Sequence, residues 1–297
     1  MSANVEPQTV RTIIDKTAKF FVAKGIPSAR LDAELLLAEV LGMDRLRLYM
    51  NFDRPLNEEE LNRARELVRR RATREPVAYI LGRREFASRM FEVDPSVLIP
   101  RPETELLVDE AEQELKRRFP DAGSAFRILE FGVGSGAIAV TLAANLPAAQ
   151  IVGTEISAEA AATARRNADK HGVSERIDLR VQPDFAGIEG PFHAIVANPP
   201  YVDPADALMM ADDVKLYEPA GALFAEENGL HWYRLLAVEA PRLLDPNGFL
   251  LMEIGQGQMP AIAQIAKGAG LDVERVSKDY AGTERMMRMS PSAIAPG

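Results

Sequence analysis

Apolar residues recur every three or four positions through the first part of the chain, which is the spacing of one helix face. The stretch 9–25, which ends at Gly25, carries this pattern at Val10, Ile13, Ile14, Ala18, Phe21 and Val22. Residues 28–42 open at Ser28, a suitable N-cap, and close at Gly42, a common helix-ending residue. The pattern therefore predicts two successive helices.

A third helix is predicted over residues 57–72, where Asn57 and Glu60 stand at the spacing of a capping box. Successive helices with one apolar face each predict a small helical bundle over residues 1–83. Residues 84–98, REFASRMFEVDPSVL, then read as two short strands joined by a turn. We expect this segment to be a β-hairpin that links the bundle to the rest of the chain.

From Pro102 onward, helical and strand-like segments alternate. Pro102 stands where a helix begins, and Glu103 and Glu105 suit its positively polarised N-terminus. Apolar runs of strand length follow at residues 126–131, 149–155, 176–181, 192–197, 248–254, 271–277 and 284–290. This alternation predicts a mostly parallel, doubly wound α/β sheet. We expect a second domain over residues 84–297, with a flexible tail at 291–297.

Composition narrows the chemistry that the chain can use. It has 297 residues, of which 47% are hydrophobic and 27% charged, as in ordinary globular proteins. The absence of cysteine excludes disulfides, thiolate metal sites and cysteine nucleophiles. The three histidines, His171, His193 and His231, show no metal-ligand spacing, so no metal is expected. No apolar run approaches membrane-spanning length, and we expect a cytoplasmic protein.

Charge is distributed unevenly along the chain. Residues 1–84 carry 16 Lys and Arg against 12 Asp and Glu, whereas the remainder carries 19 against 32. An acidic second domain argues against a broad surface for nucleic acid there. The basic residues Arg69, Arg70, Arg71 and Arg74 either dock an acidic partner or form a solvated helix face, and the second reading is the commoner one.

A glycine-rich segment, LEFGVGSGAIAV, follows the first strand of the alternating region. The strand ends at Glu130 and Phe131, and the loop consists of Gly132, Val133, Gly134, Ser135 and Gly136. Its Gly-x-Gly-x-Gly spacing is one residue shorter than the dinucleotide fingerprint. Glycines let the backbone approach a ligand, and the next helix N-terminus offers free N–H groups. A tight structural turn alone would explain one or two of them.

Acidic and aromatic residues follow the next two strands. Glu155 ends the second strand, where a carboxylate can accept from two ribose hydroxyls in NAD enzymes and adenosyl-cofactor enzymes alike. After the third strand, Asp184 can accept from an adenine amino group. Phe185 either lies against the adenine ring or belongs to the core.

The segment AIVANPPYV, residues 194–202, ends the fourth strand. Pro199 and Pro200 have no N–H to donate and must stop the strand. The backbone carbonyls of Asn198 and Pro199 therefore remain as rigidly held acceptors, and Tyr201 adds a flat face. This arrangement suits a planar group whose NH₂ donates two hydrogen bonds, although Asn-Pro is also an ordinary turn dipeptide.

With these motifs, the chain resembles the HemK/PrmC family. Members use S-adenosylmethionine to modify the glutamine amide nitrogen in the Gly-Gly-Gln loop of peptide-chain release factors. The resemblance covers nearly the whole chain and includes ARLDAELLLAEVLG, REPVAYILGRREF, VLIPRPETELLVD, the glycine loop, VANPPYV and DYAGTERMMRM. The tetrapeptide NPPY is shared with adenine-amino DNA methyltransferases, whereas LIPRPETELLVD together with the front domain is more specific.

The resemblance implies a Rossmann-like class I methyltransferase sheet whose last strand is antiparallel, preceded by a helical domain that recognises release factors. S-adenosylmethionine is the implied cofactor, S-adenosylhomocysteine its product, and no metal is implied. The implied cofactor contacts are Gly132 to Gly136, Glu155, Phe185 and Asn198. The implied substrate contacts are Asn198, Pro199, Pro200 and Tyr201.

Departures from the family pattern are mild. Val133 replaces a common threonine, Glu155 a frequent aspartate, and Phe185 a tryptophan of some members. The backbone amides, the carboxylate and the aromatic face are kept. The segment KLYEP keeps the Glu-Pro of the family but varies before it, which leaves the role of Glu218 open.

We hypothesise that the Asn198 side-chain oxygen and the Pro199 carbonyl accept the two N–H groups of the substrate amide, while Tyr201 packs on its plane. Arg101 and Glu103 either organise the cofactor mouth or orient the following helix.

Several other functions share some of these features. A ribosomal-protein glutamine methyltransferase is the nearest, followed by an adenine-N6 DNA methyltransferase, which normally needs a more basic recognition region. A nicotinamide oxidoreductase has no use for NPPY, and a non-catalytic adaptor needs no ligand loops. The expected protein is a monomer that acts on release factors, without sequence-specific nucleic acid and without a membrane.

Overall fold

The computed structural model describes residues 8–123 and 125–292. Within them the chain forms two compact units, the first comprising the residues up to Gly82 together with Ala211–Tyr217. The second unit comprises Arg83–Met210 and the residues from Glu218 onward. The sequence had indicated a division after residue 83 but not that Ala211–Tyr217 joins the first unit.

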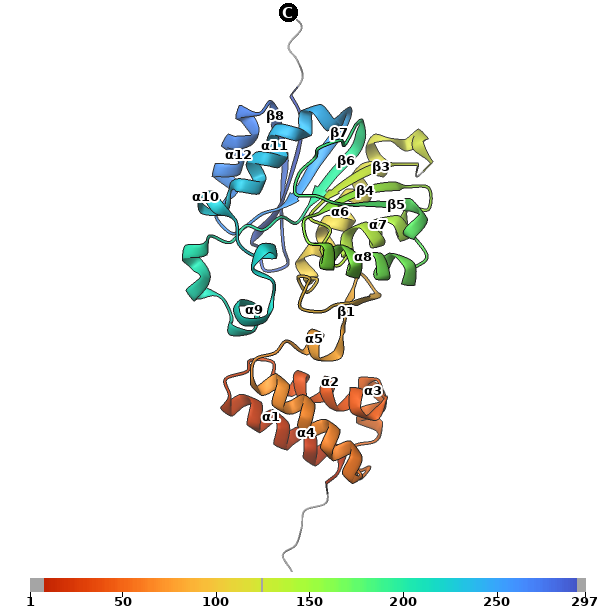
Figure 1. Ribbon diagram of the computed structural model, residues 1–297, viewed down its shortest axis with the longest axis vertical. Helices are drawn as coiled ribbons and strands as arrows, with labels where there is room; N and C mark the ends of the chain where they lie inside the picture. The colour runs from red at the N-terminus through yellow and green to blue at the C-terminus, as the bar shows by residue number, and fades with distance from the viewer. Residues whose placement is uncertain (1–7, 124, 293–297) are drawn as a thin grey trace, which may run out of the picture. The chain divides into compact units, whose positions relative to one another are not determined.

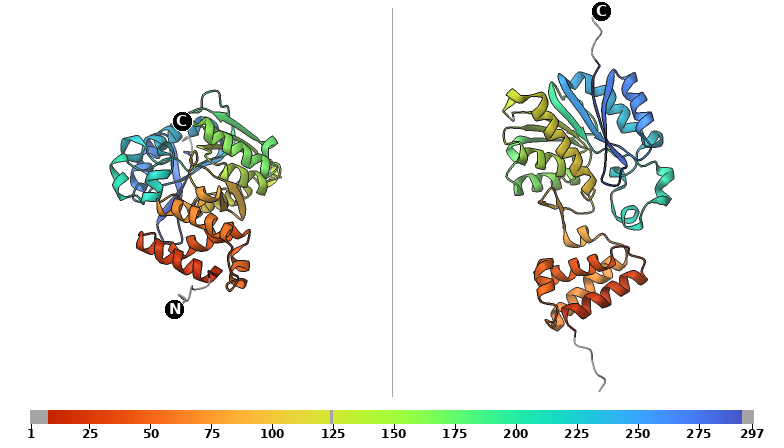
Figure 2. Two further views of the ribbon diagram at one scale, coloured as in Figure 1. Left: turned by 60° about the horizontal axis from the view of Figure 1, so that its bottom comes forward. Right: turned by 180° about the vertical axis from the view of Figure 1, so that it is seen from behind.

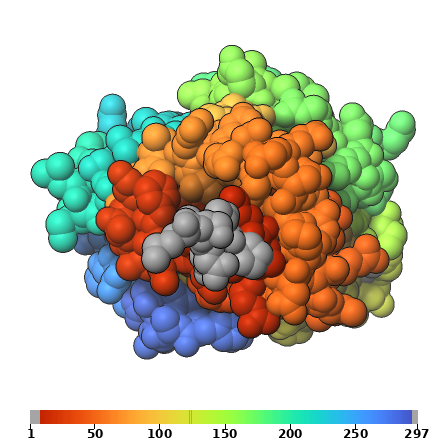
Figure 3. All heavy atoms as spheres, turned by 90° about the horizontal axis from the view of Figure 1, so that it is seen from below, coloured from red at the N-terminus to blue at the C-terminus, as the bar shows by residue number. Residues whose placement is uncertain are grey.

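Helices build the first unit (Figure 2). They are α1 (Val10–Ala23), α2 (Ala29–Leu41), α3 (Arg45–Met50), α4 (Glu58–Ala72), α5 (Val77–Leu81) and α9 (Asp212–Tyr217). Their apolar faces bury a common core that includes Val10, Ile14, Phe21, Leu36, Leu37 and Leu48. In the space-filling view, early segments (red) and later segments (orange) of this unit lie side by side on one face (Figure 3).

Local signals for these helices are mostly confirmed. Asn57 and Glu60 form the expected capping box at the start of α4, with both hydrogen bonds at 2.9 Å. Gly42 ends α2 in the left-handed conformation. Ser28 precedes α2, but its side chain makes no capping hydrogen bond. Val22 is 66% exposed, because it lies off the apolar face that Ile14 and its neighbours form.

A buried ion pair joins helices of the first unit. Arg71 on α4 is 3% exposed and donates to Asp32 of α2 at 2.7 Å. Its guanidinium also reaches Asp213 of α9 at 3.5 Å. Tyr217 of α9 donates to the carbonyl of Thr73 at 2.8 Å, which fastens the α9 segment to the end of α4.

The second unit opens with the expected hairpin, β1 (Arg83–Phe86) paired antiparallel with β2 (Arg89–Glu92). Ala87 and Ser88 form its two-residue turn with positive φ angles, which is the geometry that matches the twist of a hairpin. Ala87 reaches this conformation without the glycine that such turns usually contain.

A seven-stranded sheet follows, as the alternating pattern predicts (Figure 1). Its strands are β3 (Arg127–Phe131), β4 (Gln150–Glu155), β5 (Ile177–Val181), β6 (Phe192–Ala197), β7 (Leu244–Glu253), β8 (Leu271–Lys278) and β9 (Glu284–Pro291). They lie in the order β5-β4-β3-β6-β7-β9-β8. Within this sheet, only the pairs that involve β9 are antiparallel, so the expected antiparallel last strand is confirmed.

Helices cover both faces of the sheet (Figure 1). One core contains α6 (Pro102–Arg118), α7 (Ala137–Asn145) and α8 (Ala158–Lys170), and the other contains α11 (His231–Leu243) and α12 (Met259–Gly268). The remaining short helices are η1 (Pro120–Ala122), η2 (Ser174–Arg176), η3 (Pro204–Met209), η4 (Ala220–Ala222) and α10 (Glu226–Gly229). None of the described helices combines the length and apolar character that crossing a membrane requires.

The order of the strands reverses at β3: β4 and β5 lie on one side of it, and β6 and β7 lie on the other. Phe131 at the end of β3 is in register with Thr154 of β4 and with Ala197 of β6. The three loops that leave these strands therefore start side by side at one edge of the sheet, where α/β proteins bind ligands.

The prediction of a flexible tail over 291–297 is wrong for its first two residues. Pro291 pairs with Leu271 in the ladder between β9 and β8, and the amide of Ser292 donates to Gly270 at 2.8 Å. Residues 293–297 lie outside the described part of the chain.

Candidate active site at the carboxyl ends of the strands

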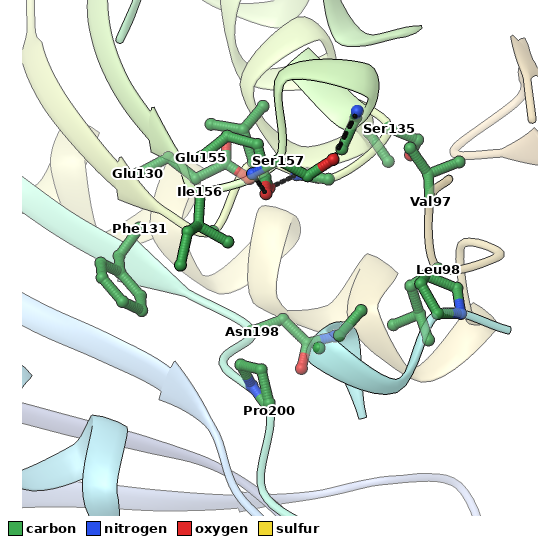
Figure 4. A pocket seen from close by; sticks show the side chains of 18 of the residues that line it. Val97, Leu98, Glu130, Phe131, Ser135, Glu155, Ile156, Ser157, Asn198 and Pro200 are labelled. Carbon is green, nitrogen blue, oxygen red and sulfur yellow. Dashed lines mark hydrogen bonds between the residues drawn. The ribbon is translucent and has the colours of Figure 1, made fainter. Parts of the chain in front are cut away.

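A cavity of about 480 Å³ opens at this edge of the second unit. Its wall comes from the loops after β3, β4 and β6, and from residues 96–104 before and within the start of α6. Figure 4 shows Glu155 and Ser157 on one side of it, and Asn198 with Pro200 on another. The sequence-predicted ligand loops are thus brought together around one space.

The glycine loop bends sharply between β3 and α7. Gly132 and Gly134 have φ angles of 72° and 56°, with open space where a Cβ would stand. Their backbone conformation, rather than crowding, calls for glycine. Gly136 has a φ of 84°, and a Cβ there would lie 3.3 Å from Ala164 on α8. This third glycine therefore also serves helix packing.

Glu155 at the end of β4 is 8% exposed and lines the cavity. One carboxylate oxygen accepts from the amide of Gly134 at 2.8 Å, and the other accepts from the amide of Ser157 at 2.9 Å. The carboxylate thereby ties the glycine loop to the start of α8. An ionised carboxylate has about four acceptor positions, so both oxygens can still accept from ligand hydroxyls.

Glu130 is a site residue that the sequence reasoning passed over. It is 1% exposed and lines the cavity, and neither carboxylate oxygen has a hydrogen-bond partner among the described residues. Burial, reinforced by the Glu155 carboxylate, raises the pKa of Glu130 well above its usual value. The signal was present in the sequence as an acidic residue inside an apolar strand, directly before the glycine loop.

Asn198 and Pro200 line the opposite wall, and Pro199 between them is buried. The side-chain Nδ2 of Asn198 donates to the hydroxyl of Thr104 at 3.1 Å. The side-chain Oδ1 has no hydrogen-bond partner within the described residues. The motif therefore presents an unused amide oxygen at the cavity wall.

Tyr201 is not among the residues that line the cavity. Its hydroxyl donates to Glu253 at 3.3 Å, and its carbonyl accepts from Gln258 at 3.0 Å. Gly229 fits against the same carbonyl, because a Cβ at that position would lie 2.2 Å from it. Burial and the neighbouring Glu253 carboxylate raise the pKa of Tyr201. These contacts hold the loop after β6, and the predicted packing of Tyr201 on the substrate amide stays a prediction.

Asp184 and Phe185 also lie away from the cavity. Phe185 is 3% exposed and packs in the core with its ring centroid 5.4 Å from that of Phe131. Asp184 is exposed and accepts from the amide of Ala186 at 3.0 Å. Burial of a large apolar ring favours the core reading of Phe185 over the adenine-facing one. Their neighbours Gln182 and Pro183 line the cavity instead.

Arg101 and Glu218 form an ion pair beside the cavity. Arg101 lines it and donates to the buried Glu218 at 2.6 Å. The other oxygen of Glu218 accepts from the amide of Ile99 at 3.1 Å. This pair links the loop before α6 to the segment that begins η4, which no local sequence pattern could reveal.

Comparisons with known proteins agree with this geometry. Residues 12–82 match the family model described as the PrmC N-terminal domain, and residues 104–225 match the methyltransferase small domain. A release factor glutamine methyltransferase of Geobacter sulfurreducens is 44% identical over 288 residues, which are 97% of this chain and 98% of that one. A release factor glutamine methyltransferase of Chlorobaculum tepidum is 41% identical over 282 residues, covering 93% and 95% of the two chains.

Solved structures support the fold. The hMettl16 catalytic domain, in complex with MAT2A 3′UTR hairpin 1, superimposes with a TM-score of 0.53 at 14% identity. The match covers 77% of this chain and 82% of that one, and it shows a shared fold only. The two relatives from Geobacter and Chlorobaculum, in contrast, are 44% and 41% identical over nearly the full length of both chains. Such similarity shows the family as well as the fold. The chain belongs to the release factor glutamine methyltransferase family.

Proposed function

We propose that this protein transfers a methyl group from S-adenosylmethionine to the side-chain amide nitrogen (N5) of a glutamine in peptide-chain release factors, within their Gly-Gly-Gln sequence. The observation that carries the proposal is that Asn198 lines the cavity with its Nδ2 bonded to Thr104, which leaves the amide oxygen for a ligand, while the opposite wall holds Glu130 and Glu155. One wall suits a cationic adenosyl donor, and the other suits a carboxamide.

The donor wall fits the chemical groups of S-adenosylmethionine. An unpartnered buried carboxylate costs free energy unless a cation or a proton joins it, and Glu130 would receive the donor's ammonium group. Glu155 would accept from the ribose hydroxyls. Ile156 lines the cavity although it is 62% exposed, so it offers an apolar surface to the adenine ring. When bound, the donor supplies an electrophilic methyl group on positively charged sulfur.

The acceptor wall addresses the weak nucleophilicity of an amide nitrogen, whose lone pair is delocalised into its carbonyl. The side-chain oxygen of Asn198 and the carbonyl of Pro199 would accept from the two N–H groups of the substrate glutamine. Acceptors held in this way stabilise the positive charge that develops on the nitrogen and keep it aimed across the cavity. Pro200 supplies an apolar surface on the same wall.

Proton removal needs no dedicated base in this scheme, because an amide nitrogen that gains a methyl group becomes acidic enough to lose its proton to the acceptors or to water. Neither histidine nor lysine occurs among the described residues that line the cavity. Catalysis would then rest on positioning. We assign recognition of the release factor to the first unit, which has its own family model, and we expect the protein to act as a cytoplasmic monomer.

The direct test incubates the full chain with a purified release factor and isotopically labelled S-adenosylmethionine, followed by mass mapping of tryptic peptides. We expect one methyl group on the glutamine of the Gly-Gly-Gln peptide. Parallel reactions contain ribosomal proteins or duplex DNA. Label in either of these, with none in the release factor, would contradict the proposal and identify the acceptor class instead.

A further inference from the structure

Three side chains from distant parts of the chain form a hydrogen-bonded series beside the acceptor wall. We propose that Thr104 and Glu253 are positioning residues that fix the orientation of the Asn198 carboxamide, so that its oxygen rather than its NH₂ faces the substrate. The inference rests on the proposed function, because only an NH₂ donor in the cavity requires that orientation.

The contacts form a single path inward from Asn198. Asn198 Nδ2 lies 3.1 Å from Thr104 Oγ1, which in turn lies 2.7 Å from Glu253 Oε2. Thr104 sits in the first turn of α6 and is 4% exposed, whereas Glu253 ends β7 and is 3% exposed. Helix α6 therefore holds Thr104, which contacts the Asn198 side chain, and strand β7 holds Glu253, which contacts Thr104.

The number of protons along this path sets the direction of each hydrogen bond. An ionised carboxylate only accepts, and a threonine hydroxyl has one proton to give. When Glu253 is ionised, the Thr104 proton is directed to it, and the lone pairs of Thr104 are left to accept from Asn198. If the Asn198 amide were reversed, two oxygens would face each other at this distance with no proton between them. The network thus selects the orientation that leaves Oδ1 at the cavity.

Burial raises the pKa of Glu253, whereas the hydroxyls of Thr104 and Tyr201 and the charge of Arg285 favour its ionised form. Its other oxygen, Oε1, accepts from the hydroxyl of Tyr201 at 3.3 Å. Both oxygens of the buried carboxylate are thus occupied by hydroxyl donors, which is the arrangement that a buried charge requires. Tyr201 belongs to the same loop as Asn198. Glu253 therefore holds that loop directly at Tyr201 and, through Thr104, at Asn198.

The experiment compares Thr104→Val, which keeps the shape and removes the hydroxyl, with Thr104→Ser, which keeps the hydroxyl. Glu253→Gln is the second variant, since an amide there donates as well as accepts and no longer fixes the direction of the Thr104 proton. Thr141→Val is the matched control, because Thr141 is also fully buried but lies outside the cavity wall and its hydroxyl has no partner in the described structure. Each protein is assayed for kcat and KM with a release factor, donor affinity by calorimetry, and Tm.

We expect Thr104→Val to lower kcat about tenfold or more, the effect of losing one buried hydrogen bond, with donor affinity close to that of the unchanged protein. Its Tm should fall, because Asn198 and the buried Glu253 each lose a partner. Thr104→Ser should recover kcat, Glu253→Gln should lower it, and Thr141→Val should leave it unchanged. Unchanged kcat in Thr104→Val, or an equal loss of donor affinity that Thr104→Ser does not recover, would overturn the inference. Absence of methyl transfer by the unchanged protein would instead overturn the proposed function, on which the inference depends.

Discussion

A carboxamide has a donor end and an acceptor end, and the proposed chemistry depends on which end of Asn198 faces the cavity. The tetrapeptide NPPY could be identified from the sequence because its proline N–H groups are absent by covalent structure. Its supports could not, since Thr104 and Glu253 lie 94 and 52 residues away from the loop residues they contact and come together only through the sheet. The role of Phe185 could not be decided from sequence for a related reason, because an aromatic residue after a strand suits either a ligand or the core.

At the same scale, Glu130→Gln tests the donor wall. Removing the carboxylate that would receive the donor's ammonium should weaken S-adenosylmethionine binding about tenfold or more, the size of a lost charge-assisted hydrogen bond. The measurement is isothermal calorimetry. Glu159→Gln is the control, because Glu159 also lines the cavity but is exposed to solvent. Equal affinity of Glu130→Gln and the unchanged protein would remove Glu130 from the donor site.

The same substitution has a second consequence, for stability. Burial raises the pKa of Glu130 above its usual 4.5, so the unfolded chain loses this proton at a lower pH than the folded protein does. The Glu130 carboxyl therefore destabilises the folded state at neutral pH. This destabilisation disappears below about pH 4.5, where the carboxyl is protonated in both states. Without donor, Glu130→Gln should melt at a higher temperature than the unchanged protein at pH 7 and near the same temperature at pH 4, by calorimetric melting.

Elements of the second unit were the most predictable part of the chain. All seven predicted runs became strands of one sheet, although the edge strands β5 and β8 are mostly not buried. The sequence of β9, which is rich in Met and Arg, marks it as a strand but does not place it between β7 and β8. That position depends on long-range contacts, among them the ion pairs of Arg288 with α6 and β8.

An ion-pair cluster fastens α6 to the last strands of the sheet, and its acid sensitivity is predictable. Glu114 on α6 accepts from Arg117 and Arg118 and lies 3.4 Å from Arg288 of β9. Arg117 foremost, then Arg118 and Arg288, lower the pKa of Glu114 to about 2 from 4.5.

A carboxyl with a lowered pKa stabilises the fold fully above about 4.5, and this contribution is lost as the pH falls towards 2. The Tm of the protein should therefore fall across this window, and Glu114→Gln should flatten the fall while lowering the Tm at neutral pH. Melting curves between pH 2.5 and 7 measure both. A Tm profile of Glu114→Gln parallel to that of the unchanged protein would show that the cluster does not contribute.

For the whole molecule, the unexpected feature is that the first unit is discontinuous. Residues 1–83 were recognisable as a bundle from helical periodicity, whereas the short α9 carries too few apolar residues to be assigned to any core from sequence. Its place follows from specific polar contacts, those of Asp213 with Arg71 and of Tyr217 with Thr73. The first unit is therefore completed by a segment that follows the NPPY loop along the chain.

The buried cation of this unit gives a stability prediction. Arg71→Ala would leave the Asp32 carboxylate at 4% exposure without its partner, and breaking such a pair costs about 3 kcal/mol. Urea unfolding should show that loss in the free energy of unfolding. Arg69→Ala, at an exposed position on the same helix turn, is the control and should change it little. Similar values for the two variants would mean that the pair is not important for stability.

Separate measurements of binding and turnover in Asn198→Ala test the central claim most directly. If the loop after β6 positions the acceptor amide, turnover with a release factor should fall by a hundredfold or so, the scale seen when one transition-state hydrogen-bond partner is removed. The calorimetric affinity for S-adenosylmethionine should stay near that of the unchanged protein. An equal loss of donor affinity, or turnover that persists without the Asn198 amide, would contradict the account.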